Sequence, residues 1–137
     1  VALCAEMTGG SQRSLDLSVA HAKTREQFGK PIGSFQAISH KCADMLVRVE
    51  SARSATYYAA WALAHEQPGA QTSSCLAKAY CSDAFAKVAG DAIQVHGGLG
   101  FTWEQEPHLH FRRAKTIEHF LGDASWNREL AARALLD

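Results

Sequence analysis

Four short runs rich in glycine, proline and turn-forming residues divide this sequence into long segments. They lie at positions 29–33, 67–69, 97–100 and 122–123. Glycine and proline end helices, and between these breaks the apolar residues recur every third or fourth position without strand-like alternation. We therefore predict an all-α fold, with helices at 1 to about 26, 34 to about 66, 70 to 96, 106 to 120 and 124 to 136. Such helices predict one domain over residues 1–137, an antiparallel up-down helical bundle of four main helices plus a short terminal helix.

Several residues refine these helices. Ser34 and Asp123 are good N-caps, and Pro107 suits a first helical turn. Gly9 and Gly10 interrupt the first helix at a cost of about 1 kcal/mol each relative to alanine, which indicates close packing or room for a ligand. The expected inner face of the second helix comprises Phe35, Ile38, Cys42, Met45, Leu46, Val49, Thr56, Ala60 and Leu63, and that of the third Leu76, Tyr80, Phe85, Val88, Ala89 and Ala92.

Composition excludes several classes of partner. The chain has 14 basic and 14 acidic side chains and no long run of one sign, which argues against nucleic acid and anionic membrane surfaces as partners. No apolar stretch reaches the roughly 20 residues that a bilayer span needs. The four cysteines show no C-x-x-C spacing and favour buried or half-buried thiols in a reducing compartment. We expect a cytoplasmic protein without a signal peptide, and the start inside a helix suggests a fragment of a longer chain.

The stretch R-E-Q-F-G-K-P-I-G-S-F-Q, from Arg25 to Gln36, carries more than a turn requires. A guanidinium, two aromatic rings and two amides within twelve residues would suit a large anionic aromatic ligand such as a dinucleotide. The alternative is that the aromatic rings pack on the bundle and that Arg25 is a solvated cation at a helix C-terminus. Farther along, Gln94 to Gly98 place an amide beside bare backbone that a ligand could approach, although such glycines often only stop a helix.

Four pieces of this sequence resemble the acyl-CoA dehydrogenase family of flavoproteins. They are R-x-Q-F-G-x-P-I at 25–32, S-F-Q-A-I at 34–38, A-D-M at 43–45 and Q-V-H-G-G-L-G-F at 94–101. The resemblance covers the whole chain but matches only the family's C-terminal domain, so the N-terminal helical domain and the middle β-domain would lie outside it. It implies that the parent protein oxidises an acyl-CoA at Cα–Cβ, with FAD as hydride acceptor and an electron-transfer flavoprotein as reoxidant.

The same resemblance implies a cofactor site. Residues of two segments would contact the pyrophosphate and adenine end of an FAD that is held mainly by a neighbouring subunit. Cofactor binding would therefore require a dimer of like or unlike acyl-CoA dehydrogenase subunits. The implied FAD-contacting residues are Arg25, Gln27, Phe28, Phe35, Gln36, Gln94, Val95, His96, Gly97 and Gly98.

The sequence departs from the family at the catalytic base. Counting on from the R-R-A-K stretch at 112–115 puts Leu121 where the family commonly has a glutamate, and Arg113 where it has an aspartate. Leucine cannot accept a proton, so we predict no catalytic residue in this chain and no activity for the chain alone. The base would lie upstream on the first helix or in an unlike subunit, or Glu118 or Asp123 would substitute, although an ion pair or a helix cap fits those two better.

Two alternative functions remain open. The chain could belong to a non-catalytic subunit of a heteromeric acyl-CoA dehydrogenase, an arrangement of unlike subunits that bacterial dehydrogenases acting on steroid side-chain CoA thioesters resemble. It could also belong to a flavin monooxygenase or oxidase built on the same fold. A metal site is not expected, because His108, His110 and His119 show no ligand spacing with a cysteine or paired carboxylate.

Overall fold

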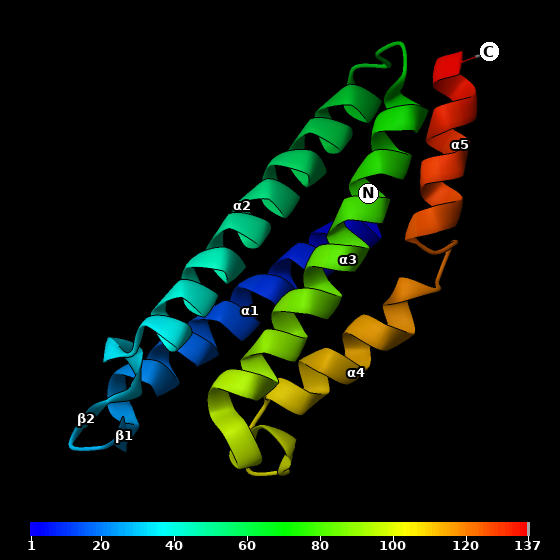
Figure 1. The fold of residues 1–137 in the computed structure, drawn as a ribbon. Helices are drawn as coiled ribbons and strands as arrows, with labels where there is room; N and C mark the ends of the chain where they lie inside the picture. Colours follow the sequence, from blue (N-terminus) through cyan, green and yellow to red (C-terminus); the bar gives the residue numbers. More distant parts are fainter. Residues whose placement is uncertain (137) are drawn as a thin grey trace.

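The computed structural model describes residues 1–136, which form a bundle of five α-helices (Figure 1). The helices are α1 (Ala2–Thr24), α2 (Gln36–Ala64), α3 (Ala70–His96), α4 (Pro107–Glu118) and α5 (Ala124–Leu136). There are also two short 3-10 helices. The first, η1 (Ile32–Ser34), lies just before α2, and the second, η2 (Gly97–Phe101), follows α3 directly. The all-α bundle is confirmed. A small antiparallel hairpin of β1 (Glu26–Gln27) and β2 (Lys30–Pro31) was not predicted.

Helix α3 is the centre of the bundle, because it contacts each of the other four helices. In Figure 1, α1 and α2 lie along it, and α4 and α5 follow one another along its length. Its buried residues include five alanines, which let the neighbouring helices approach closely, together with larger side chains such as Phe85 and Val88. The hairpin and the C-terminal end of α3 lie at the same end of the molecule (Figure 1).

Phe85 explains one of the two glycines in α1. A Cβ added at Gly10 would lie 2.5 Å from Cζ of the Phe85 ring, whereas one added at Gly9 would meet nothing within 4 Å. Phe85 is 1% exposed, so its ring has little freedom to move away. Gly10 is therefore the point at which α1 and α3 pack most closely on this ring, and Gly9 contributes nothing to that contact.

The predicted helix starts are right in two cases and wrong in one. Pro107 opens α4, and Oδ1 of Asp123 accepts a hydrogen bond of 2.8 Å from the backbone N–H of Trp126 at the start of α5. Ser34 does not cap α2. Its hydroxyl donates to the carbonyl of Pro31 at 2.7 Å and closes η1, and the residue before α2 is Phe35.

The predicted inner faces also need a correction. Leu46 and Leu63 are each 48% exposed, Leu76 is 47% exposed and Tyr80 is 37% exposed. Leu76 and Tyr80 line a groove of about 430 Å³ between α2 and α3, together with Tyr58. Helical spacing identifies residues that share a face, but it does not say whether that face meets the chain's own core.

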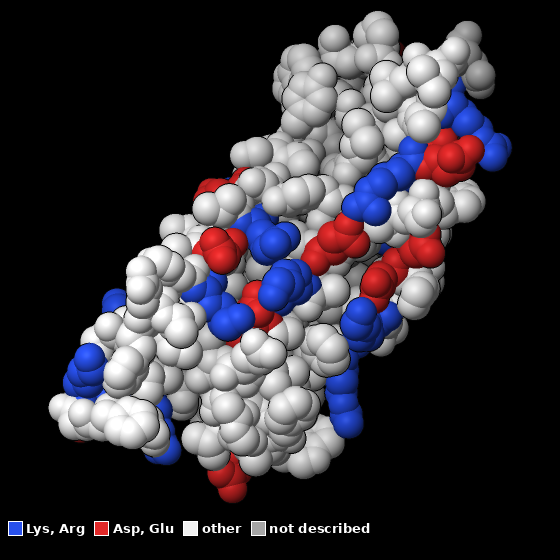
Figure 2. Space-filling model, viewed as in Figure 1, with Lys and Arg blue, Asp and Glu red and all other residues white. Residues whose placement is uncertain are grey.

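The distribution of charged side chains and the burial of the cysteines agree with what the composition predicts. Figure 2 shows basic and acidic side chains interspersed in a band across the face drawn. Cys4 and Cys81 are buried, and Cys42 and Cys75 are half-buried. Among the described helices, none has both the length and the apolar run needed to cross a membrane.

The two adjacent glycines of α1 provide a matched test of the packing. Gly10→Ala should lower the free energy of unfolding by about 1–3 kcal/mol, because the new methyl group collides with the Phe85 ring. Gly9→Ala should raise it by up to about 1 kcal/mol, because alanine is the better helix former and the site is open. Urea unfolding of both variants measures the difference, and equal effects of the two changes would contradict this packing.

Candidate functional site

The hairpin after α1 fixes where Arg25 and Gln27 lie. Its two-residue loop, Phe28–Gly29, has positive φ at both positions, +55° and +75°, as a tight turn between two antiparallel strands requires. The backbone N–H of Ile32 donates to the carbonyl of Arg25 at 2.8 Å and closes the hairpin back onto the end of α1. Arg25 and Gln27 are thereby held at the end of the bundle where α3 stops.

These segments enclose a pocket of about 450 Å³, which we call the α1–α3 pocket. It is formed by the end of α1, the hairpin, η1, the end of α3 and the start of η2. Six of the ten residues predicted from the sequence line it. The lining residues are His21, Arg25, Gln27, Ile32, Val95, His96, Gly97, Gly98 and Leu99.

The end of α3 gives this pocket open backbone. Gly97 follows the last helical residue with φ of +62°, a conformation that glycine adopts without strain. A Cβ added at Gly97 or Gly98 would meet nothing within 4 Å, so a ligand can approach the main chain here. His96 is buried beside it, and its Nδ1 lies 2.8 Å from the carbonyl oxygen of Ala92. Since a carbonyl only accepts hydrogen bonds, Nδ1 of His96 carries the proton.

The electrostatics of the pocket favour an anion. Arg25 supplies a permanent positive charge, and none of the described lining residues carries a carboxylate. The rings of His21 and His96 stack with centroids 4.4 Å apart. Burial, followed by the charges of His96 and Arg25, lowers the pKa of His21 below its ordinary value. A guanidinium fork, an amide and bare backbone form a donor set that fits the diphosphate of a dinucleotide.

Four of the predicted residues lie outside the α1–α3 pocket. Phe28 is 91% exposed, and its ring meets the edge of Phe35 at 6.1 Å between centroids. Gln36 is exposed on the first turn of α2, within 3.4 Å of the His40 ring nitrogen. Gln94 lines a separate hollow of about 330 Å³, which Gly97 also lines.

Sequence reasoning missed three of the lining residues, His21, Ile32 and Leu99, and of these only His21 has a titratable side chain. His21 lies four residues before Arg25, the residue that follows the end of α1, and this is the spacing of neighbouring side chains on a helix face. That signal was available in the sequence. Its contact with His96, 75 positions away in the chain, depends on how α1 and α3 pack and could not be deduced from spacing.

A second region contains Leu121, the residue that the sequence analysis predicts at the position of the family's usual base. Leu121 is 69% exposed and has φ of +58°, which is strained for a leucine. It lines a cavity of about 290 Å³ together with Val1, Leu3, Cys75, Lys78 and others. Of the described residues that line this cavity, none has a carboxylate side chain.

Two polar side chains hold the backbone around Leu121. Nζ of Lys78 donates to the carbonyls of Glu118 at 3.2 Å and Gly122 at 3.0 Å. Nδ2 of Asn127 donates to the carbonyls of Gly122 and Asp123 at 3.0 and 2.9 Å. Burial lowers the pKa of the Lys78 ammonium. These contacts account for the positive φ of Leu121, because they fix the turn between α4 and α5.

The acidic residues near this turn have structural partners. Oε2 of Glu118 pairs with Nζ of Lys115 at 2.9 Å, and the Asp123 carboxylate caps α5. Arg113, which the sequence analysis predicts at the family's aspartate position, donates to Oε1 of Glu6 on α1 at 2.6 Å. Neither Glu118 nor Asp123 lines the cavity that contains Leu121.

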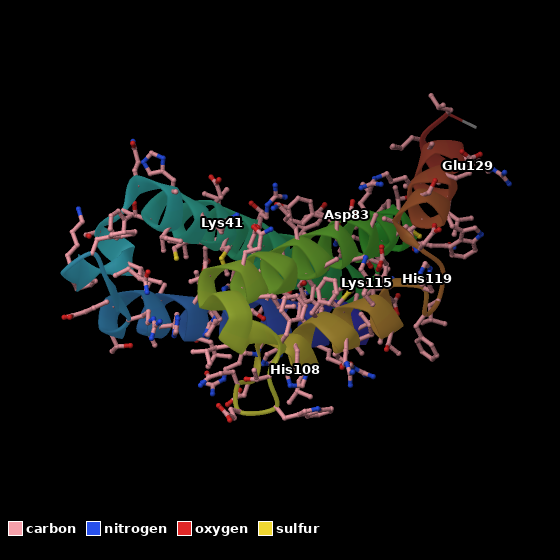
Figure 3. The ribbon with its side chains drawn as sticks, turned by 60° about the horizontal axis from the view of Figure 1, so that its bottom comes forward. Lys41, Asp83, His108, Lys115, His119 and Glu129 are labelled. Atoms are coloured by element: carbon pink, nitrogen blue, oxygen red, sulfur yellow. The ribbon has the colours of Figure 1, made fainter. Side chains whose placement is uncertain are left out.

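The histidines of α4 are spread along the helix. Figure 3 shows His108 near the start of α4 and His119 just past its other end. The His108 ring is buried against the edge of Trp103, with centroids 4.7 Å apart. Across the described residues, no group of three or more histidine, cysteine, aspartate or glutamate side chains is arranged to hold a metal ion.

Comparison with known families assigns the fold. The family model described as "Acyl-CoA dehydrogenase, C-terminal domain" matches residues 1–136. The chain belongs to this acyl-CoA dehydrogenase family. The resemblance inferred from the four pieces of sequence is thereby confirmed, and so is the assignment to the family's C-terminal domain.

Individual relatives agree with the family assignment. The chain is 49% identical over 133 residues to acyl-CoA dehydrogenase FadE34 of Mycobacterium tuberculosis, covering 95% of this chain and 19% of that protein. It is similar to PigA in complex with FAD, with a TM-score of 0.91 and 32% identity over 96% of this chain and 34% of that one. It is also similar to the ChsE4–ChsE5 complex of M. tuberculosis, with a TM-score of 0.92 and 33% identity over 98% of this chain and 36% of that one. The acyl-CoA dehydrogenase domain described here therefore spans a fifth to about a third of these relatives.

Proposed function

We propose that this chain is the FAD-contacting, dimer-forming C-terminal domain of a flavoprotein that oxidises acyl-CoA thioesters between Cα and Cβ. The observation that carries the proposal is the α1–α3 pocket, where Arg25 and Gln27 meet the open backbone of Gly97 and Gly98. The helical and β-domains of the parent protein would lie outside residues 1–137. Bound FAD would supply the hydride acceptor, and an electron-transfer flavoprotein would reoxidise it.

We propose that different residues of the pocket contact different parts of the FAD. The Arg25 guanidinium would hold the diphosphate, because two parallel N–H donors match its oxygens. Gln27 and the main chain of Gly97 and Gly98 would supply neutral donors beside it. Val95, Ile32 and Leu99 would cover the apolar edge of the adenine.

The exposed aromatic at the tip of the hairpin supports a contact outside this chain. Phe28 is held at positive φ, a costly conformation for a bulky residue, and its ring is almost wholly exposed. We propose that Phe28 and Phe35, with Gln36 close by, meet the FAD or the subunit that carries it. Gln94 would contact the same ligand from the neighbouring hollow.

Dimer formation is supported by apolar surface that the chain does not bury itself. Tyr58, Leu76 and Tyr80 line the groove between α2 and α3, and Trp61 and Leu63 are each 48% exposed. Apolar residues gathered in this way are typical of protein contacts. The partner would be a like or unlike acyl-CoA dehydrogenase subunit, which would hold the rest of the flavin.

The base for α-proton abstraction would come from elsewhere. Leu121 cannot accept a proton, and Glu118 and Asp123 are already engaged with Lys115 and the start of α5. We propose that the chain supplies no catalytic residue, and that the base lies on a part of the parent protein before Val1 or in an unlike subunit.

One observation favours a second candidate. The solved ChsE4–ChsE5 structure, to which this chain is similar, is a complex of two differently named proteins. Together with Leu121, this supports a subunit without a base that completes a heteromeric acyl-CoA dehydrogenase. Stoichiometric co-purification of a relative with glutamate at the position of Leu121 would favour this candidate over a complex of identical subunits.

The reaction is tested by anaerobic titration of the native protein, purified with its flavin, against short, long and ring-bearing acyl-CoA thioesters. At least one should bleach the visible flavin band, because oxidation at Cα–Cβ reduces the flavin. Acetyl-CoA is the control, because it has no Cβ and cannot be dehydrogenated. Bound flavin that no thioester bleaches would mean that an unlike partner supplies the base or that the reaction is not acyl-CoA dehydrogenation, and rapid oxygen use by the reduced flavin would indicate a monooxygenase or oxidase.

Cofactor contact is tested by Arg25→Gln in the native protein. The change should weaken FAD binding by about tenfold to a hundredfold, because a charge-assisted hydrogen bond contributes about 1.5–3 kcal/mol. Lys23→Gln is the matched control, since it removes a positive charge from the same helix but lines a different hollow. Fluorescence titration of the apoprotein with FAD measures both, and equal losses would mean that Arg25 acts only through bulk charge.

A further inference from the structure

His21 lines the α1–α3 pocket together with Arg25. Its ring lies one helical turn before Arg25, lines the same cavity, and stacks on the ring of His96 with an angle of 22° between the planes. His96 is fixed in turn, because its Nδ1–H donates to the carbonyl of Ala92. Two imidazoles and a guanidinium therefore converge on one pocket.

This arrangement disfavours the charged form of His21 while the pocket holds no anion. Two charged rings at 4.4 Å would repel each other, and Arg25 adds a third positive charge one turn away. Half-burial of the ring also penalises its charged form. Burial first, then the charges of His96 and Arg25, lowers the pKa of His21 below the ordinary 6.5.

We propose that His21 is a further ligand-binding residue, which takes up a proton as the diphosphate of a dinucleotide enters the pocket beside Arg25. Two phosphate charges would offset Arg25 and give the imidazolium a hydrogen-bond acceptor. The penalty on the charged ring would thereby become an attraction. This inference rests on the proposed FAD contact, and it adds that His21 takes up a proton when FAD binds.

The other groups that face His21 are consistent with this assignment. From α1 the charged neighbour is Arg25, and from α3 the titratable neighbour is His96. The hairpin contributes the neutral Gln27, and η1 and η2 contribute the apolar Ile32 and Leu99. Among the described residues that line the pocket there is no carboxylate that could hold the proton in place of the ligand.

The direction of the pH dependence follows. Above the pKa of His21 in the complex, the ring is neutral with and without ligand, and pH has no effect through it. Between that value and the lower pKa of the free protein, the complex binds the extra proton, so affinity rises as pH falls. Below the pKa of the free protein the gain is complete. The rise is at most about tenfold per pH unit for one proton.

The experiment measures FAD binding to the native apoprotein between about pH 5 and about pH 8, where histidine titrates. Calorimetry in two buffers of different ionisation enthalpy counts the protons taken up. We expect uptake of up to one proton per FAD, and tighter binding at lower pH. In His21→Phe the ring stack is kept but the proton cannot bind, so both the uptake and the pH dependence should disappear.

Two further variants make the result decisive. His21→Gln should lose the proton uptake as well, and it covers the case in which the larger phenylalanine disturbs folding. His65→Phe is the matched control, because His65 is exposed at the far end of α2 and should leave the uptake unchanged. Tight FAD binding without proton uptake, or uptake that survives in both His21 variants, would overturn this inference alone. Loss of the difference between Arg25→Gln and Lys23→Gln would overturn the proposed FAD contact itself.

Discussion

Burial of α3 is the constraint on which the rest of the structure depends. Its small side chains let α1 approach until the Phe85 ring rests against Gly10, and α2, α4 and α5 also pack against α3. Beyond Gly10, α1 continues along α3, and Leu15 and Val88 belong to one cluster of buried residues. That arrangement stacks His21 on His96 and brings Arg25 to the glycines after α3. The packing of α1 against α3 thus brings the residues of the α1–α3 pocket together.

Local signals predicted the helices well, because glycine and proline act on the backbone within a few residues. Pro107 and Asp123 start their helices as expected, whereas Ser34 was misread because Pro31 and Ile32 lead into a 3-10 turn that uses its hydroxyl. The hairpin escaped prediction because its loop places Phe28, a residue with no preference for positive φ, where asparagine or glycine is usual.

The candidate site was predictable in part. The motifs named six of the residues that line the α1–α3 pocket, because family resemblance carries contact information that spacing does not. His21 was missed although its four-residue spacing from Arg25 was visible in the sequence. Gln94 lines another hollow, because the direction of its side chain depends on the rotation of α3 about its axis. The exposure of Leu76 and Tyr80 could not be foreseen either. The sequence pattern of an apolar helix face is the same whether that face packs on its own chain or on a partner subunit.

The central claim is that the α1–α3 pocket receives the diphosphate of FAD. A crystal structure of the native protein with its flavin tests it most directly. The account predicts a phosphate oxygen within hydrogen-bond distance of the Arg25 guanidinium, beside the main chain of Gly97 and Gly98, with the flavin ring held by a second subunit. A diphosphate bound elsewhere, with this pocket filled by side chains of another domain, would contradict it.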